Sequence, residues 1–480
     1  MKPASARRPA FFALLAASAL AGCAGTATPG TGILAPRVSE AQEIRAGQRA
    51  AREASRTLGL VADQELQDYV QRVGARIAAE SDRAQLPWTF RVVDDAMPNA
   101  FGMPGGYVFV TRGLLGVLDS EAELAAVLAH EIGHVTARHG VQALARQSGA
   151  EIGVWAVPIS ALRSLDAGSG LGAGLLFREH EAEAERQADD LAFRYALAAG
   201  YDVREMADVF GALGRVEIIG GRSALPPWLT THRDPGQRAE TMAQRALAVS
   251  EADSLQQHRV EYLEQIEDLA YGQDPRQAVI RGSTFVHPDL RFRIDLPSGW
   301  RLRNLTQALV ATSPDQDAAI QLTIVEQVAP GAAAERFVAQ SGIDATGSVT
   351  EDVVNERLAV TVPFRVTTGA GTAEGVAAWV SYGGRTYQIV GVTTNQDANG
   401  HAAAVRSAVR TFNAVSDARL ADLRPSRINI VRLGRATTFD EFNRRYPSVV
   451  DAEEIALLNR VAGGSSRLRA GGRMKRVVKG

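Results

Sequence analysis

The sequence predicts an α+β protein with several domains. A length of 480 residues predicts about three domains. Helical patterns dominate residues 39–272, alternating strand patterns follow over 282–415, and a strand–helix–helix–strand order occupies 425–480. Hydrophobic residues make up 46% of the chain, which is enough for packed cores, and the net charge of −2 gives no indication of nucleic-acid binding.

Residues 1–22 have the pattern of a lipoprotein signal peptide. A basic start precedes the apolar run 11–20, which is too short to cross a bilayer, and Cys23 follows as in a bacterial lipobox. Cys23 is the only cysteine, so we predict that it carries lipid; an ordinary secretory signal cleaved near Ala24 is the alternative. No Asp follows the cysteine, and resemblance to lipoprotein sorting signals then favours the outer membrane, with residues 23–38 as a flexible tether.

The first large unit, 39–272, is expected to be mainly α-helical. The stretches 41–57 and 63–80 have long helical patterns, whereas 90–93 and 106–111 are strand candidates. Further along, Ser120 precedes an apolar run and has Glu123 three residues later. This capping-box signature predicts that another helix begins there.

That helix carries the most informative motif of the chain, His130-Glu131-Ile132-Gly133-His134. Histidines four residues apart on a helix lie on one face and can ligate a single Zn²⁺. Glu131 is then placed to deprotonate a water molecule at the metal. The leading interpretation is a hydrolase of peptide bonds, and the alternative is two core or surface histidines beside a solvated glutamate.

A third metal ligand is expected from the acidic stretch 178–190. Its charge density and its lack of Pro and Gly predict a helix, and most of its acids fit a solvated helix face. Glu185 differs because Asp189 follows four residues later, on the same face. A ligand carboxylate beside a second carboxylate that orients a histidine N–H is common in metal sites.

With these motifs, residues 40–250 resemble the zinc metallopeptidase family that includes HtpX, Oma and the CaaX prenyl protease. Its members carry HExxH on one helix and ExxxD on a later one, and the stretches 99–115 and 134–139 also match. The resemblance implies a zincin-type domain with a small sheet and one Zn²⁺ per chain. The implied ligands are His130, His134 and Glu185, with Glu131 as catalytic base and Asp189 supporting a ligand.

Two further segments have functional interpretations. Zinc proteases of this type often bind an extended substrate on an exposed sheet edge, and Gly106, Tyr107 and Val108 are predicted to form that edge; an ordinary hairpin turn is the alternative. The Gly- and Ala-rich stretch 148–176 is predicted to be a lid that restricts access to zinc, with a core helix pair joined by a glycine loop as the alternative.

The resemblance also points to His232 and Arg238. The family has a Thr-His-Pro turn followed by an arginine, and its histidine is thought to stabilise the oxyanion or to act as a reversible zinc ligand. Here Pro235 stands three residues after His232, which leaves the local turn open. We expect a catalytic role for His232 and a structural or ligand-supporting role for Arg238. The ordinary surface or core histidines are expected to be His139, His180, His258, His287 and His401.

The two C-terminal units carry no catalytic motif. Unit 282–415 is expected to be an α+β accessory domain with an antiparallel sheet that recruits substrates or partners, and its run 292–300 resembles PsbP-like domains. Unit 425–480 resembles LysM-type glycan-binding modules, although 434–437 stands where their Gly-Asp-Thr turn would be. Peptidoglycan binding and a purely structural cap therefore both stay open.

These features together predict a zinc-dependent endopeptidase of the bacterial cell envelope. It would be lipid-anchored on the periplasmic side of the outer membrane and would cleave misfolded or misassembled envelope proteins. The alternative function is an envelope assembly factor or chaperone whose protease activity is latent.

Overall fold

The computed structural model describes residues 38–142, 182–219, 235–249 and 254–480, with short gaps at 277, 306–307, 316, 326–327, 341–342, 369–370, 394–397 and 416–422. The predicted signal peptide and tether with Cys23, the stretch 148–176 and His232 lie outside the described residues. None of the helices within the described ranges combines the length and the apolar character that a membrane crossing requires.

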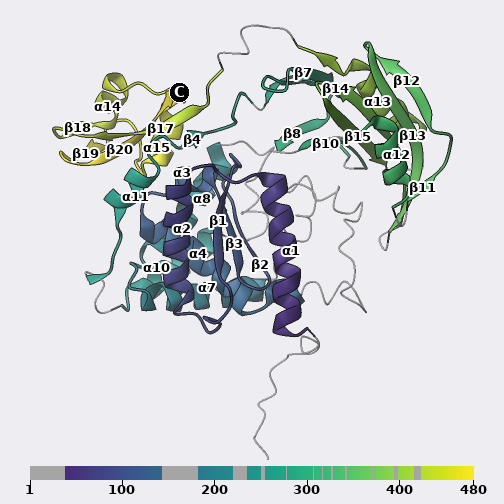
Figure 1. Cartoon of the computed structure of the whole chain (residues 1–480). Helices are drawn as coiled ribbons and strands as arrows, with labels where there is room; N and C mark the ends of the chain where they lie inside the picture. Colours follow the sequence, from purple (N-terminus) through teal and green to yellow (C-terminus); the bar gives the residue numbers. More distant parts are fainter. Residues whose placement is uncertain are drawn as a thin grey trace, which may run out of the picture.

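The first part of the chain folds around a three-stranded sheet (Figure 1). Its elements are α1 (Glu40–Leu58), α2 (Gln64–Ala78), β1 (Thr89–Val93), β2 (Ala100–Met103), β3 (Tyr107–Thr111), α3 (Arg112–Val117), α4 (Glu121–Thr136), α7 (Ala182–Ala198), α8 (Glu205–Ile219), α10 (Pro235–Ala246) and α11 (Arg259–Gln265). Alanines of α1 pack on one face of the sheet against Phe101, Met103 and Phe109. Helices α2 and α4 pack with Phe90, Val108 and neighbouring apolar residues on the other.

Helix α4 runs through the centre of this part. Every residue from Ala122 to Val135 is buried, and α2, α7 and α8 pack around the helix. Its predicted start is confirmed: the Ser120 hydroxyl accepts a hydrogen bond from the Glu123 backbone N–H at 3.0 Å. The Glu123 carboxylate in turn accepts a hydrogen bond from the backbone N–H of Asp119, the residue before the N-cap, rather than from that of Ser120.

The order of the sheet, β1-β3-β2, corrects the predicted substrate edge. Strand β3 pairs with β1 in parallel and with β2 in antiparallel fashion, so Tyr107 and Val108 lie in the central strand. Gly105 and Gly106, with φ of 80° and 98°, belong to the hairpin turn between β2 and β3. Among the described residues, β2 is an edge strand of this sheet, and α4 packs against it.

The second part of the chain is an antiparallel sheet unit joined to a smaller sheet. Its elements are β5 (Val279–Arg281), β6 (Thr284–His287), β7 (Phe292–Asp295), β8 (Arg301–Leu305), β9 (Ala308–Thr312), β10 (Ala318–Val325), α12 (Pro330–Val338), β11 (Ile343–Ala345), β12 (Thr350–Val354), β13 (Arg357–Thr368), β14 (Gly371–Tyr382), β15 (Arg385–Thr393), α13 (Ala398–Thr411) and β16 (Asn413–Ala414). The large sheet has the order β11-β13-β14-β15-β10-β9-β8, with β12 also paired to β13. Helix α12 packs against the face that carries Trp379, and α13 packs against the face that carries Ala378.

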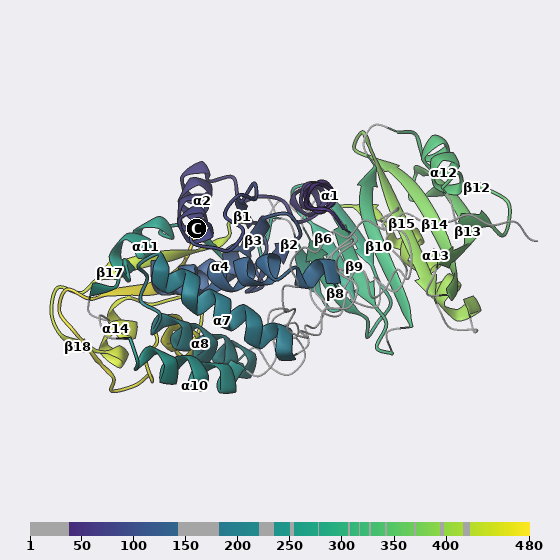
Figure 2. The same ribbon diagram turned by 90° about the horizontal axis from the view of Figure 1, so that it is seen from below.

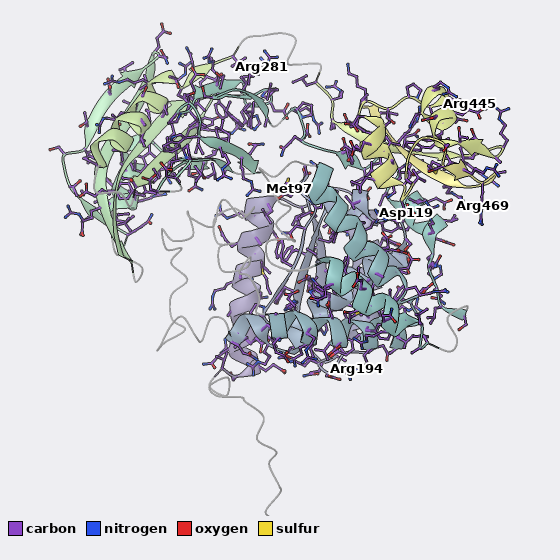
Figure 3. All side chains as sticks on the ribbon, turned by 180° about the vertical axis from the view of Figure 1, so that it is seen from behind. Met97, Asp119, Arg194, Arg281, Arg445 and Arg469 are labelled. Atoms are coloured by element: carbon purple, nitrogen blue, oxygen red, sulfur yellow. The ribbon has the colours of Figure 1, made fainter. Side chains whose placement is uncertain are left out.

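The last part has the predicted strand–helix–helix–strand order. Its elements are β17 (Ser426–Arg432), β18 (Thr437–Thr438), α14 (Phe439–Arg445), α15 (Ala452–Leu458), β19 (Arg467–Leu468) and β20 (Arg473–Lys479). Strand β17 pairs with β20 and also with β4 (Ala270–Tyr271), so residues before the second unit contribute to the sheet of the last one. Asp119, labelled in Figure 3, lies where this part meets the start of α4, 3.5 Å from the Lys475 Nζ atom.

Candidate metal centre

The candidate site forms where α4 and α7 pack side by side, as Figure 2 shows. Their close approach depends on Gly133, because a Cβ atom at that position would lie only 2.8 Å from the Ala188 carbonyl oxygen. Ala188 is itself small and fully buried. This contact brings Glu185 of α7 opposite the two motif histidines of α4.

Three side chains converge there. The Nε2 atoms of His130 and His134 lie 3.0 Å apart, and the Glu185 carboxylate lies 3.5 Å from the first and 3.3 Å from the second. All three residues are at most 4% exposed, and their potential ligand atoms lie within 4.8 Å of one another. Two imidazole nitrogens and one carboxylate oxygen are a donor set suited to Zn²⁺, so these residues fit one metal ion.

Asp189 and Arg238 support this group from one side. The Asp189 Oδ1 atom accepts a hydrogen bond from His130 Nδ1 at 2.9 Å, which leaves His130 Nε2 directed at Glu185. The Arg238 guanidinium donates to both Asp189 oxygens, at 2.8 and 2.7 Å, and lies 3.2 Å from Glu185. It also lies over the ring of Phe210, 4.2 Å from the centroid. A role of Arg238 in supporting the site stays a prediction, and these contacts are the ones through which it would act.

The charges around His130 favour a cation. Burial and the Arg238 charge oppose protonation of His130, but its contacts with Asp189 and Glu185 outweigh them and raise its pKa to about 9. Burial likewise opposes the charge on Asp189, yet His130 and Arg238 lower its pKa to about 2. The carboxylates that attract a proton to this place would attract a metal cation in the same way.

Glu131 lies on the side of α4 that faces β2. It is 2% exposed, and a Cβ atom on Gly102 would lie 3.4 Å from its Oε2 atom. The same Cβ atom would lie 3.0 Å from a methyl group of Val135. Glycine at position 102 therefore leaves room between the strand and the Glu131 carboxylate.

His139 is a residue of the site that sequence reasoning missed. It was expected to be ordinary, but its Nδ1 atom lies 2.9 Å from His134 Nδ1 and its Nε2 atom lies 3.0 Å from the Gln187 Oε1 atom. The signal available in the sequence was its place five residues after His134, within the stretch 134–139 that matches the family. That stretch continues past α4, whose last residue is Thr136.

The structure thus brings together most of the residues singled out from the sequence. The group consists of His130, His134, Glu185, Asp189 and Arg238, together with Glu131 next to His130 on α4, and His139 and Gln187 lie beside it. Gly106, Tyr107 and Val108 lie instead at the turn into and within the central strand of the sheet.

Comparison with known proteins agrees with this geometry. Residues 64–246 match the family described as Peptidase family M48. This region of the chain belongs to that family. It contains all six residues of the group named above.

The similar curated proteins are longer than the part of them that matches this chain. A Vibrio cholerae relative is 32% identical over 219 residues, which cover 43% of this chain and 44% of that protein. The beta-barrel assembly-enhancing protease of Yersinia pestis is 29% identical over 43% of this chain and 44% of its own length. The mitochondrial metalloendopeptidase OMA1 of Schizosaccharomyces pombe is 49% identical over 77 residues, 16% of this chain and 23% of that one. The chain spans less than half the length of each of these relatives.

Among solved structures, the PsbP protein of Synechocystis, CyanoP, matches 28% of this chain and 95% of its own length. Its sequence identity is 14% and its TM-score is 0.24, a similarity too low to carry an argument about this chain.

Proposed function

We propose that this protein is a zinc-dependent endopeptidase. The observation that carries the proposal is the convergence of two buried imidazoles and one buried carboxylate, with the buried Glu131 next to His130 on the same helix. His130, His134 and Glu185 would hold the metal. When bound, Zn²⁺ would act as a Lewis acid that polarises the scissile carbonyl and lowers the pKa of a water molecule.

Glu131 would act as the general base. Its carboxylate would take a proton from the attacking water and then deliver that proton to the nitrogen of the leaving amine. Asp189, held by Arg238, would keep the Nδ1 proton of His130 in place, so that the His130 Nε2 lone pair stays directed at the metal position. His232 remains a candidate donor to the developing oxyanion, on the family resemblance alone.

The substrate backbone would bind along β2 rather than along residues 106–108. The Thr111 N–H donates to the Asn99 carbonyl at 2.9 Å, so in an antiparallel ladder the backbone groups of Ala100 and Gly102 point away from β3. Gly102 is the residue beside Glu131. An extended peptide paired with this edge would place its backbone next to the catalytic carboxylate, with little dependence on side-chain identity.

The envelope setting is supported by the relatives and by the N-terminal sequence. Relatives named beta-barrel assembly-enhancing protease favour misassembled envelope proteins as substrates. The predicted lipid attachment at Cys23 would anchor the chain on the periplasmic side of the outer membrane. Peptidoglycan binding by residues 425–480 stays a prediction from the sequence.

The substitution Glu131→Gln tests the proposed activity. It removes the base but keeps the size of the side chain, so hydrolysis of an unfolded protein such as casein should be abolished while bound zinc and circular dichroism stay unchanged. The control is Glu183→Gln on the exposed face of α7, which should retain full activity. Full activity in Glu131→Gln would rule out the proposed mechanism.

A second function is favoured by the words assembly-enhancing in the relatives' names. The protein would then promote assembly of envelope proteins with its protease activity latent. Complementation of a deletion strain with Glu131→Gln separates the two functions. Rescue of the envelope phenotype supports the assembly role, and failure to rescue supports the protease.

A further inference from the structure

The second histidine of the candidate metal site, His134, has its own series of hydrogen bonds on the side of its ring away from Glu185. His134 Nδ1 lies 2.9 Å from His139 Nδ1, and His139 Nε2 lies 3.0 Å from Gln187 Oε1. His139 is 5% exposed and stands edge-on to the His134 ring, with the two centroids 5.0 Å apart. This series of hydrogen bonds therefore runs from the candidate site to Gln187 on the exposed side of α7.

When the His134 and His139 rings are both neutral, these hydrogen bonds allow one arrangement of protons. A Gln187 carbonyl oxygen can only accept a hydrogen bond, so His139 Nε2 must carry a proton and His139 Nδ1 must present a lone pair. His134 Nδ1 must then carry the proton that lies between the two Nδ1 atoms. A neutral His134 with its proton on Nδ1 has its lone pair on Nε2, the atom that faces His130 and Glu185.

We propose that His139 and Gln187 are positioning residues that fix the tautomer and the ring orientation of His134 for metal binding. The inference rests on the proposed metal site and adds to it a support that is independent of Asp189. A carboxylate fixes the first histidine, and a neutral imidazole held by an amide fixes the second.

The position of Gln187 ties this support to the third ligand. Gln187 lies on α7 two residues after Glu185 and two residues before Asp189. One helix therefore supplies a ligand, the partner of His130 and the outer partner of His139. Correct packing of α7 on α4 assembles all three functions at once, and displacement of α7 would release them together.

The test compares the zinc affinity of three variants, measured by competition with a chelator on metal-stripped full-length protein. His139→Phe keeps a ring but removes the acceptor, and it should weaken zinc binding about 10–100-fold. Gln187→Met removes the outer acceptor at an exposed position, and it should weaken binding by a smaller factor. Gln187→Glu keeps an acceptor oxygen and should bind zinc at least as tightly as the wild type.

The matched control is Gln142→Met. Gln142 is a glutamine whose side-chain amide donates to a backbone carbonyl, that of Ala137 at 3.1 Å, and it takes no part in the hydrogen bonds of His139 and Gln187. Its zinc affinity should equal that of the wild type. Nitrogen NMR of histidine-labelled, metal-free protein gives a second readout: His139 should be protonated on Nε2 and His134 on Nδ1, and Gln187→Met should change this pattern.

The outcomes separate this inference from the proposed function. If the wild type binds no zinc, the metal site itself is wrong. If the wild type binds zinc but His139→Phe and Gln187→Met bind it equally well, the positioning role is overturned and the metal site stands. Should His139→Phe fail to fold, the comparison of Gln187→Met with Gln187→Glu and the NMR pattern decide the question.

Discussion

Replacing Gly133 by alanine should weaken metal binding strongly while changing the stability of the fold little. Alanine in the middle of a helix is favoured over glycine by about 1 kcal/mol. The new Cβ atom, however, would lie 2.8 Å from the Ala188 carbonyl oxygen and 3.2 Å from the Ala188 Cα atom. Overpacking of this kind costs about 1–3 kcal/mol, so the two effects partly offset each other in the free energy of unfolding.

The metal site has no such compensation. Ordinary contact begins at 3.4 Å, so α7 would have to move away from α4 by about 0.6 Å. Metal–ligand distances are defined to about 0.2 Å, and Glu185 would move with α7. We therefore expect zinc affinity to fall about 10–100-fold, the range seen when the groups around a metal site are disturbed.

The assay is chelator competition for zinc, combined with thermal unfolding of the metal-free protein. Gly140→Ala is the control, because its Cβ atom would lie 3.5 Å from Pro104, an ordinary contact distance. Adding Ala188→Gly to Gly133→Ala should not restore binding, because the contact is with the Ala188 backbone. A Gly133→Ala protein with zinc affinity within twofold of the wild type would refute the reasoning.

Three other predictions concern the same part of the molecule. Stripping the metal should lower the melting temperature of the wild type, measured by calorimetry, because a ligand that binds only the folded state stabilises it; an unchanged melting temperature would contradict the proposed site. Burial, and after it the Glu123 charge, raises the pKa of Glu205 from 4.5 to about 7. The stability that the protein has while Glu205 is protonated in both the folded and the unfolded state is therefore lost as the pH rises between these two values. Glu205→Gln should therefore stabilise the protein by about 1–3 kcal/mol at pH 8 but not at pH 4.5 in urea unfolding, and equal effects at both pH values would count against this. Arg460→Met leaves the buried Glu123 carboxylate without its 2.9 Å ion pair and should lower the free energy of unfolding in urea by about 3 kcal/mol. The control Arg435→Met, on the exposed surface, should lower it by less than about 1 kcal/mol. Equal losses in the two variants would contradict the importance of burial for the first ion pair.

The parts of the site that sequence could predict are those set by local geometry. Ser120 and Glu123 mark the start of α4, and the spacing of four residues places His130 and His134 on one face. The same spacing between Glu185 and Asp189 singled out these two acids among many in one helix. Each of these inferences needs only the period of a helix, which is independent of the rest of the fold.

The parts that sequence could not fix depend on which elements meet. Nothing in the alternation of residues 106–111 shows that β1 pairs with β3 in parallel, yet this pairing places β3 in the centre and β2 at the edge. His139 lies beyond the end of α4, and its hydrogen-bond partner Gln187 lies 48 residues later in the sequence. The prediction for Arg238 came from family resemblance, since its 49-residue separation from Asp189 has no local signature.

The C-terminal unit shows the same dependence on packing and bears on how the chain divides into parts. Lys475 is fully buried, and its Nζ atom donates to the carbonyl oxygens of Gly116, Val117 and Leu118 just before α4. Burial lowers the pKa of this lysine to about 8, so keeping it charged has a cost that its contacts with those carbonyls and with Asp119 must offset. The last strand of the chain therefore helps to hold the start of the helix that carries His130, Glu131 and His134, whatever else the unit binds.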